Sequence, residues 1–308
     1  MTSDRSTAAT ARAVRPPQFF EFSGELLAAH AAGTLSPGWT FSGEHSWIYR
    51  AQNFVVDITW LDKGQAEERI SGPEEHALLV VDDVAVSVAS GDEAAATLSG
   101  PVLAIVPPGP THIECTRPGF IVRVYSCRDE RIASRAHNDA AYVNPNPSVA
   151  PLPSEPTRPM SAGIRAYAMD DIPRDPDRFG RIFRTETLMI NWFEPQIGPR
   201  STDHLTPHSH DDFEQASVTM VGEFVHHVRR PWSERLSDWR SDEHVQVNSP
   251  SVTIIPPGNI HTTRAVGPGA HQLIDIFAPP RRDFIDRGWV LNQADYETLP
   301  TLSERTPS

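Results

Sequence analysis

Residues 104–112 read AIVPPGPTH, and residues 253–261 read TIIPPGNIH. In both stretches an apolar run leads into Pro-Pro-Gly, and a histidine follows three residues after the glycine. Proline fixes φ at the second position of a tight turn, and glycine supplies the positive φ at the third. Each stretch therefore predicts a buried strand that turns sharply into the next strand. Because the pattern occurs twice, the sequence predicts a duplicated β domain.

Short apolar runs bounded by Gly, Pro, Asp and Asn continue on both sides of these stretches, which is typical of strands. Many short strands with few helices favour a sandwich or barrel in each half, so the expected fold class is all-β. The predicted strands are 54–60, 77–81, 85–89, 102–106 and 120–125 in the first half, and 182–193, 213–221, 224–228, 252–255 and 272–277 in the second; the predicted helices are 24–32 and 281–287.

Prolines mark the division between the halves. The chain of 308 residues contains 29 prolines, whereas average usage predicts about 15. They are densest in residues 144–160, NPNPSVAPLPSEPTRPM, which have no apolar period and are typical of a semi-rigid extended linker. We therefore expect a disordered N-terminus at 1–16, an N-terminal barrel at 17–135, a linker at 136–163, a C-terminal barrel at 164–296 and a tail at 297–308.

The composition limits the possible partners. The formal net charge is −13, which argues against nucleic acid because a phosphate backbone is bound by a basic stripe. The sequence contains no apolar run long enough to span a membrane, and its first residues contain no apolar core of a secretory signal. The two cysteines, Cys115 and Cys127, are too few for a disulfide framework. We expect a cytoplasmic protein that binds a small molecule.

The second half contains residues that bind metals. Residues 207–214 read PHSHDDFE. His208 and His210 are two residues apart, so both imidazoles project from one side of an extended segment. Glu214 has the same parity, and the Pro-Pro-Gly turn returns His261 on a neighbouring strand. Three imidazoles and one carboxylate suit a divalent transition metal, so these four residues are the predicted ligands.

The pattern HxHx₃E, followed downstream by PxGxxH, resembles the two signature motifs of the cupin superfamily. The resemblance covers roughly residues 40–130 and 180–280, and it implies two jelly-roll barrels, each a double-stranded β-helix, in one chain: a bicupin. It also implies one divalent metal per chain, with Fe(II) as the first expectation and Mn, Ni, Co or Zn as alternatives. One departure is that seven rather than six residues separate Glu214 from Gly222.

The first half lacks this ligand set. Counting back from Glu75 by the spacing of the second half places Arg69 and Ser71 where the two close histidines stand. An arginine keeps its proton and cannot bind a metal, so only Glu75 and His112 remain as ligands. We expect a degenerate site of these four residues, with Arg69 paired to Glu75, in a barrel kept for packing and assembly. The alternative is an impaired second metal site.

Four further residues are candidates for positions near the metal or its ligand. His226 and His227 are adjacent on a predicted strand, so one faces inward and is a candidate to support a metal ligand. Asp275, within LIDIF, is expected either to reach the cavity or to pair with an arginine. Trp192 is a candidate wall of the substrate pocket, although an aromatic residue on a barrel strand more often belongs to the core.

A metal with four protein ligands keeps about two octahedral positions open. The first functional expectation is a dioxygenase that cleaves a ring or C–C bond of a small substrate chelated through two oxygens. The alternatives are an isomerase, lyase or decarboxylase that acts on a sugar acid or carboxylate without O₂, and a ligand-binding bicupin without turnover. Because the edge strands of a barrel need cover, we expect a compact monomer or a homodimer.

Overall fold

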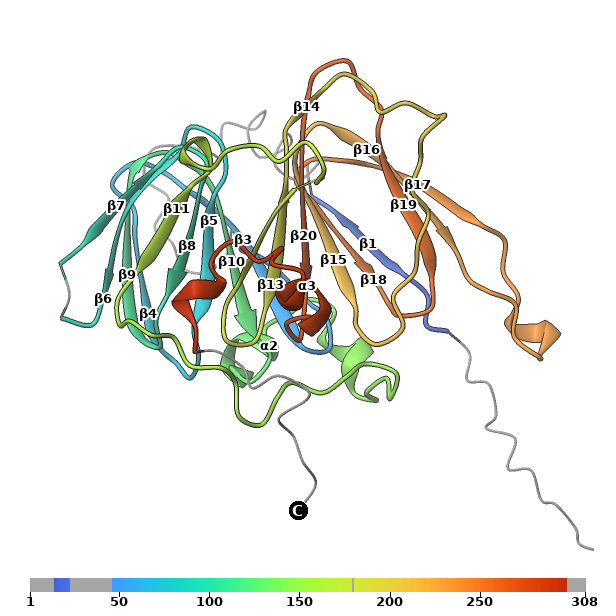
Figure 1. The fold of residues 1–308 in the computed structure, drawn as a ribbon, viewed down its shortest axis with the longest axis horizontal. Coiled ribbons are helices and arrows are strands. Elements are labelled where there is room, and N and C mark those ends of the chain that lie inside the picture. The colour runs from blue at the N-terminus through green and yellow to red at the C-terminus, as the bar shows by residue number, and fades with distance from the viewer. Residues whose placement is uncertain (1–13, 23–45, 93, 179, 298–308) are drawn as a thin grey trace, which may run out of the picture.

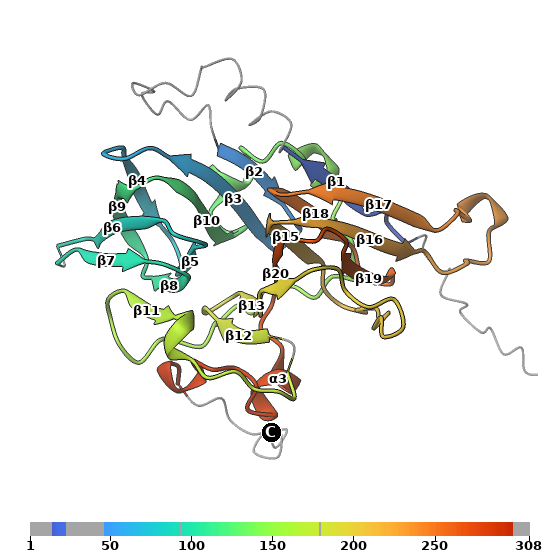
Figure 2. The same cartoon turned by 90° about the horizontal axis from the view of Figure 1, so that it is seen from above.

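The computed structural model describes residues 14–22, 46–92, 94–178 and 180–297, which form two β barrels lying side by side (Figure 1). Each barrel consists of one large and one small sheet. The two large sheets pack against each other and the small sheets lie on the outside (Figure 2). The predicted all-β fold class is therefore confirmed. The predicted helix 24–32 lies outside the described residues.

Ten strands of the N-terminal barrel lie within the described residues. They are β2 (Ser46–Arg50), β3 (Phe54–Leu61), β4 (Ala66–Gly72), β5 (His76–Val80), β6 (Ala85–Ser90), β7 (Ala96–Ser99), β8 (Val102–Val106), β9 (Gly109–Arg117), β10 (Gly119–Ser126) and β11 (Arg165–Ala168). The large sheet has the order β11-β8-β5-β10-β3-β2, and the small sheet has the order β4-β9-β6-β7.

The C-terminal barrel repeats this plan. Its strands are β1 (Gln18–Glu21), β12 (Gly180–Arg184), β13 (Met189–Phe193), β14 (Gln196–Ile197), β15 (Gln215–Val221), β16 (Glu223–Arg229), β17 (Glu243–Asn248), β18 (Ser251–Ile255), β19 (Ile260–Ala265) and β20 (Ala270–Phe277). The large sheet has the order β1-β18-β15-β20-β13-β12, with β14 paired to β20, and the small sheet has the order β17-β16-β19.

The predicted strand 182–193 is two strands, β12 and β13, joined by a tight turn. The Thr185 hydroxyl stabilises this turn by accepting the backbone N–H groups of Thr187 at 3.2 Å and Leu188 at 3.0 Å. The predicted helix 281–287 is present as α3 (Arg282–Asp286). Within the described ranges, no helix is long and apolar enough to cross a membrane.

The two barrels exchange one edge strand each. β1 precedes the N-terminal barrel in the chain but pairs with β18 of the C-terminal barrel. β11 follows the proline-rich segment 144–160 but pairs with β8 of the N-terminal barrel. The predicted boundaries 17–135 and 164–296 therefore place these two strands in the wrong barrels. Each exchanged strand covers the edge of the other barrel's large sheet, whose N–H and C=O groups would otherwise lack partners.

The largest apolar core lies between the barrels. Phe54, Ile58 and Leu79 of the N-terminal barrel join Ile190 and Ile274 of the C-terminal barrel in one cluster of buried side chains, which we call the shared core. Because strand residues alternate between faces, each strand of the large sheets sends alternate side chains into this core and the others into its own barrel. Burial of this apolar surface holds the barrels together as one unit.

The interiors of the two barrels differ in chemistry. β5 of the N-terminal barrel fills its interior with aliphatic side chains, Leu78 and Val80. The corresponding strand β15 of the C-terminal barrel carries the small buried hydroxyl residues Ser217 and Thr219. The Thr219 and Ser251 hydroxyls are 2.6 Å apart, so their polar groups satisfy each other. The interior positions of β15 therefore carry small polar side chains where those of β5 carry aliphatic ones.

Two buried carboxylates link the barrels reciprocally. Glu75 Oε2 accepts a hydrogen bond from the backbone N–H of Glu186, in the β12–β13 turn, at 3.2 Å. Glu214 Oε2 accepts one from the backbone N–H of Gln52, in the β2–β3 turn, at 2.5 Å. Arg165 also contacts Glu75, with 2.6 Å between Nη2 and Oε1. Each barrel thus places one carboxylate against a turn of the other.

Phe54 tests whether the shared core couples the barrels. Its side chain is fully buried, so Phe54→Ala should reduce the free energy of unfolding by about 3–5 kcal/mol. Thermal unfolding followed by circular dichroism should remain a single transition at a lower temperature, because both barrels lose the same core. Val143→Ala, at a position 75% exposed, is the control and should leave the transition unchanged. Two separated transitions, of which only one is shifted, would contradict this coupling.

Candidate metal centre

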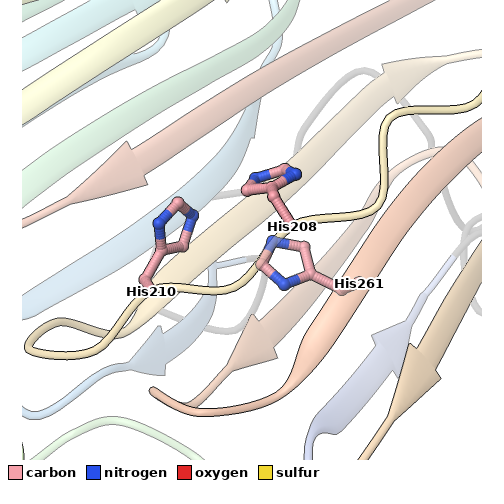
Figure 3. Close-up of side chains that lie close together, drawn as sticks. All are labelled: His208, His210 and His261. Atoms are coloured by element: carbon pink, nitrogen blue, oxygen red, sulfur yellow. The ribbon is translucent and has the colours of Figure 1, made fainter.

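His208, His210 and His261 lie together in the C-terminal barrel (Figure 3). One nitrogen of each imidazole lies within 4.8 Å of the corresponding nitrogens of the others. The ring centroids of His208 and His261 are 4.5 Å apart, and those of His208 and His210 are 4.9 Å apart. His261 is buried, His210 is half-buried and His208 is exposed, so the group is open on one side.

Backbone hydrogen bonds position the three histidines. The His208 N–H donates to the His261 carbonyl at 3.1 Å, and the His261 N–H donates to the His208 carbonyl at 2.8 Å. In the Pro-Pro-Gly turn, the Gly258 N–H donates to the His210 carbonyl at 2.7 Å. Gly258 has a φ of +83°, a conformation that favours glycine. The turn predicted from the sequence therefore holds the two separated parts of the motif together.

The tautomers of two histidines follow from their backbone partners. His208 Nδ1 lies 2.9 Å from the Thr206 carbonyl oxygen, and His261 Nδ1 lies 3.0 Å from the Asn259 carbonyl oxygen. Because a carbonyl oxygen only accepts, each Nδ1 carries the proton and each Nε2 carries a lone pair. His261 Nε2 is buried and has no partner within the described part of the chain. A buried lone pair beside two further imidazoles fits a divalent transition metal.

The environment keeps two of these imidazoles neutral. Burial, followed by the proximity of His261 and His208, lowers the pKa of His210 to about 3. Burial also lowers the pKa of His261 to about 4. Both rings are therefore unprotonated near pH 7, which is the state that binds a metal.

The structure does not bring Glu214 to the histidines, so its assignment as the fourth ligand is corrected. Glu214 faces the shared core, and burial there raises the pKa of its carboxyl group. Its neighbour Gln215 faces the barrel interior, where Oε1 lies 2.9 Å from His210 Nε2. The sequence contained a signal for this: six residues separate Gln215 from Gly222, the spacing from which Glu214 departs by one.

A cavity of about 810 Å³ opens beside the three histidines. Its volume suits a small organic ligand. Asp275 lines this cavity, which was one of the two placements expected for it; the other was a pair with an arginine. The wall is partly apolar and partly polar, and includes Asn191, Phe193, Arg200, Gln215, Phe224, Leu273, Asp275 and Phe277.

The corresponding region of the N-terminal barrel is occupied by an arginine. Arg69 pairs with Asp129, at 2.9 Å between Nη2 and Oδ2, and not with Glu75 as expected. Its guanidinium also lies over the Tyr125 ring, 3.3 Å from the ring centroid. A guanidinium held in this way keeps its proton and cannot bind a metal.

The other members of the predicted degenerate site do not converge. His112 faces outward, where its Nδ1 lies 2.7 Å from Glu68 Oε1. Glu75 lies between the barrels, where Tyr296 donates a hydrogen bond to Oε2 at 2.9 Å. Ser71 lies on β4, and its side chain is outside the described set. The four residues therefore form no cluster among the described side chains.

Of the other predicted residues, His226 lies near His261, and burial together with this proximity lowers the pKa of His226 to about 3, whereas His227 and Trp192 are directed away from the three histidines. His226 is buried, and its Nδ1 lies 2.9 Å from Thr263 Oγ1. His227 faces the other side of β16 and pairs with His244, with 2.7 Å between their Nδ1 atoms. Trp192 belongs to the shared core and does not line the cavity. An aromatic residue on a barrel strand more often belongs to the core, and Trp192 does so.

Comparison with known proteins shows the fold. No family model matches the chain, and no curated protein matches it. Salicylate 1,2-dioxygenase from Pseudoaminobacter salicylatoxidans, in an adduct with gentisate, is 13% identical, with a TM-score of 0.54 over 89% of this chain and 83% of that chain. Oxalate decarboxylase from Lactobacillus farciminis, in a formate complex, is 15% identical, with a TM-score of 0.50 over 79% of this chain and 86% of that chain.

A third solved structure, AerE from Microcystis aeruginosa, is 8% identical, with a TM-score of 0.52 over 78% of this chain and 95% of that chain. The protein is a bicupin in fold. The predicted resemblance to the cupin superfamily is thereby confirmed at the level of fold. Identities this low leave the reaction of this bicupin to be argued from its own site.

We expect this bicupin to bind about one divalent metal per chain through the imidazoles of His208, His210 and His261. His261→Ala should abolish binding, because it removes the buried Nε2, whereas the backbone pair with His208 remains. His112→Ala, at the matching position of the N-terminal repeat, is the control and should bind as the wild type does. Elemental analysis after dialysis measures the stoichiometry. Two tightly bound equivalents in the wild type, or undiminished metal in His261→Ala, would contradict the assignment.

A neighbouring pair of variants separates Gln215 from Glu214. Gln215→Glu places a carboxylate beside His210, and its charge should raise metal affinity about tenfold or more in competition with a chelator. Glu214→Ala should leave metal affinity unchanged but reduce the free energy of unfolding by about 1–3 kcal/mol, because the Gln52 N–H loses its acceptor. If Glu214→Ala loses its metal and Gln215→Glu has the metal affinity of the wild type, Glu214 is the ligand and this assignment is wrong.

Proposed function

We propose that this bicupin is a metal-dependent dioxygenase acting on a small organic substrate that chelates through two oxygen atoms. One observation carries the proposal: three imidazoles converge beside a cavity, and no carboxylate joins their cluster among the described residues. We propose one divalent transition metal per chain, with Fe(II) first and Mn, Ni, Co or Zn as alternatives.

Two properties of the three-histidine ligand set support oxygen chemistry: it would leave coordination positions of the metal free, and it carries no negative charge. If His208, His210 and His261 hold the metal, coordination positions would remain for a substrate that chelates through two oxygens and for O₂. Because imidazoles are neutral, a bound divalent cation keeps its full charge and favours anionic oxygens such as those of an enolate or catecholate. When bound, the metal would mediate electron transfer from the chelated substrate to O₂. The reaction balances without an external reductant, because both oxygen atoms enter the substrate as a C–C bond breaks.

The residues around the site orient two of the imidazoles and form an apolar part of the cavity wall. The carbonyl groups of Thr206 and Asn259 hold His208 and His261 with Nε2 free for the metal. The aromatic side chains of the cavity wall restrict water and offer flat surfaces to an organic ring. They are contributed by Phe193, Phe224, Phe277 and Phe284.

Asp275 favours a second candidate, a decarboxylase, isomerase or lyase that acts on a carboxylate or sugar acid without O₂. Such chemistry needs a protein group that gives or takes a proton, and Asp275 is a carboxyl group on the cavity wall. The solved structures offer both classes for comparison, since one is named a dioxygenase and another a decarboxylase. Binding of a small molecule without turnover is the remaining possibility.

An oxygen electrode distinguishes these functions. Protein loaded anaerobically with Fe(II) should consume about one O₂ per substrate converted when supplied with salicylate, gentisate, catechols or β-diketones. His261→Ala should consume none, and His112→Ala should match the wild type. Conversion of oxalate or another carboxylate without oxygen uptake would overturn the dioxygenase proposal in favour of the non-oxidative one. Absence of turnover with every metal and substrate would overturn both.

A further inference from the structure

Asp275 lies on β20 and is connected to the three-histidine site. Its neighbours on the adjacent strands are Ser217 of β15 and Asn191 of β13. The Ser217 hydroxyl donates a hydrogen bond to Asp275 Oδ1 at 2.7 Å. The Gln215 amide donates to that hydroxyl at 3.1 Å, and its Oε1 lies 2.9 Å from His210 Nε2. Three hydrogen bonds therefore link His210 to Asp275, and both ends line the cavity.

The N-terminal barrel carries an ion pair at the corresponding position. Arg123 on β10 takes the place that Asp275 takes on β20, and Asp57 on β3 takes the place of Asn191 on β13. Arg123 Nη2 lies 3.0 Å from Asp57 Oδ2, and Arg123 also pairs with Glu67. The charges there compensate one another inside the barrel, as buried charges ordinarily do.

Asp275 has no such counterion. Among the described residues it forms no ion pair, and its hydrogen bond comes from the neutral Ser217. Burial raises the pKa of Asp275 to about 7, although the bond from Ser217 acts in the opposite direction. Near neutral pH a substantial fraction of this carboxyl group is therefore protonated. The other titratable or charged groups that face the cavity are His208, His210, His261, His271, Glu194, Arg174, Arg178 and Arg200.

We propose that the neutral carboxyl of Asp275 donates a hydrogen bond to an anionic oxygen of the ligand held at the three-histidine site. The inference rests on the proposed metal site. It limits the ligand to small acids or enolates that carry, besides the oxygens bound at that site, another anionic oxygen directed toward β20. Asn191 extends the polar wall, since its Oδ1 is buried without a partner in the described part of the chain. Ionised Asp275 repels the same oxygen, so affinity for such a ligand falls as the pH rises.

The test measures oxalate binding to the Co(II)-loaded protein by the visible absorption of the metal. Between about pH 6 and about pH 8 the wild-type Kd for oxalate should rise about tenfold, because Asp275 loses its proton in this range. Asp275→Asn keeps a hydrogen-bond donor that does not titrate, so this tenfold change should disappear. Ser217→Ala removes the bond that favours the ionised carboxylate, so the change should move to higher pH.

The controls distinguish the possible failures. Asp203→Asn, at an exposed aspartate outside the cavity, should show the wild-type profile. Titration of metal-bound water is common to wild type and variants, so it cancels in the comparison. If oxalate binding requires His261 but Asp275→Asn keeps the wild-type profile, the role of Asp275 is overturned while the metal site stands. If oxalate binds equally well to His261→Ala, the metal site and this inference are both overturned.

Discussion

Adjacent residues of a strand face opposite sides of its sheet, and in this bicupin those sides are the shared core and the barrel interior. At the start of β15 this alternation sends Glu214 to the partner barrel and Gln215 to the histidines. At the start of β5 it sends Glu75 to the partner barrel and buries His76 inside its own. The same constraint therefore creates the reciprocal carboxylate contacts and removes the carboxylate from the metal centre.

The two copies have diverged by changing the side chains on the interior face while keeping the face on the shared core. Leu78 and the Arg123–Asp57 ion pair occupy positions in the N-terminal barrel that correspond to those of Ser217, Asp275 and Asn191 in the C-terminal barrel, where Asp275 and Asn191 line the cavity. The N-terminal barrel still contributes half of the shared core and covers one carboxylate of its partner. Its role is consistent with packing and assembly, and the candidate chemistry is confined to the C-terminal copy.

Local patterns predicted much of the fold and the convergence of three histidines. The Pro-Pro-Gly turn is encoded within a few residues, so the sequence predicted both the turn and the approach of His261 to His208. The position of Glu214 was mispredicted because residues 211–214 are bends and irregular chain, and parity cannot be counted through a segment that is not a strand. The exchange of β1 and β11 was not predicted because edge pairing depends on contacts distant in sequence. The pairing of Arg69 with Asp129 was not predicted for the same reason, since the two residues are 60 positions apart.

The most direct measurement of the central claim is an anomalous difference map, recorded at the absorption edge of the bound metal, from crystals of the metal-loaded protein. We expect one strong peak within bonding distance of the imidazoles of His208, His210 and His261, with Glu214 still hydrogen-bonded to Gln52. A peak inside the N-terminal barrel, or a Glu214 carboxylate turned toward the metal, would contradict it.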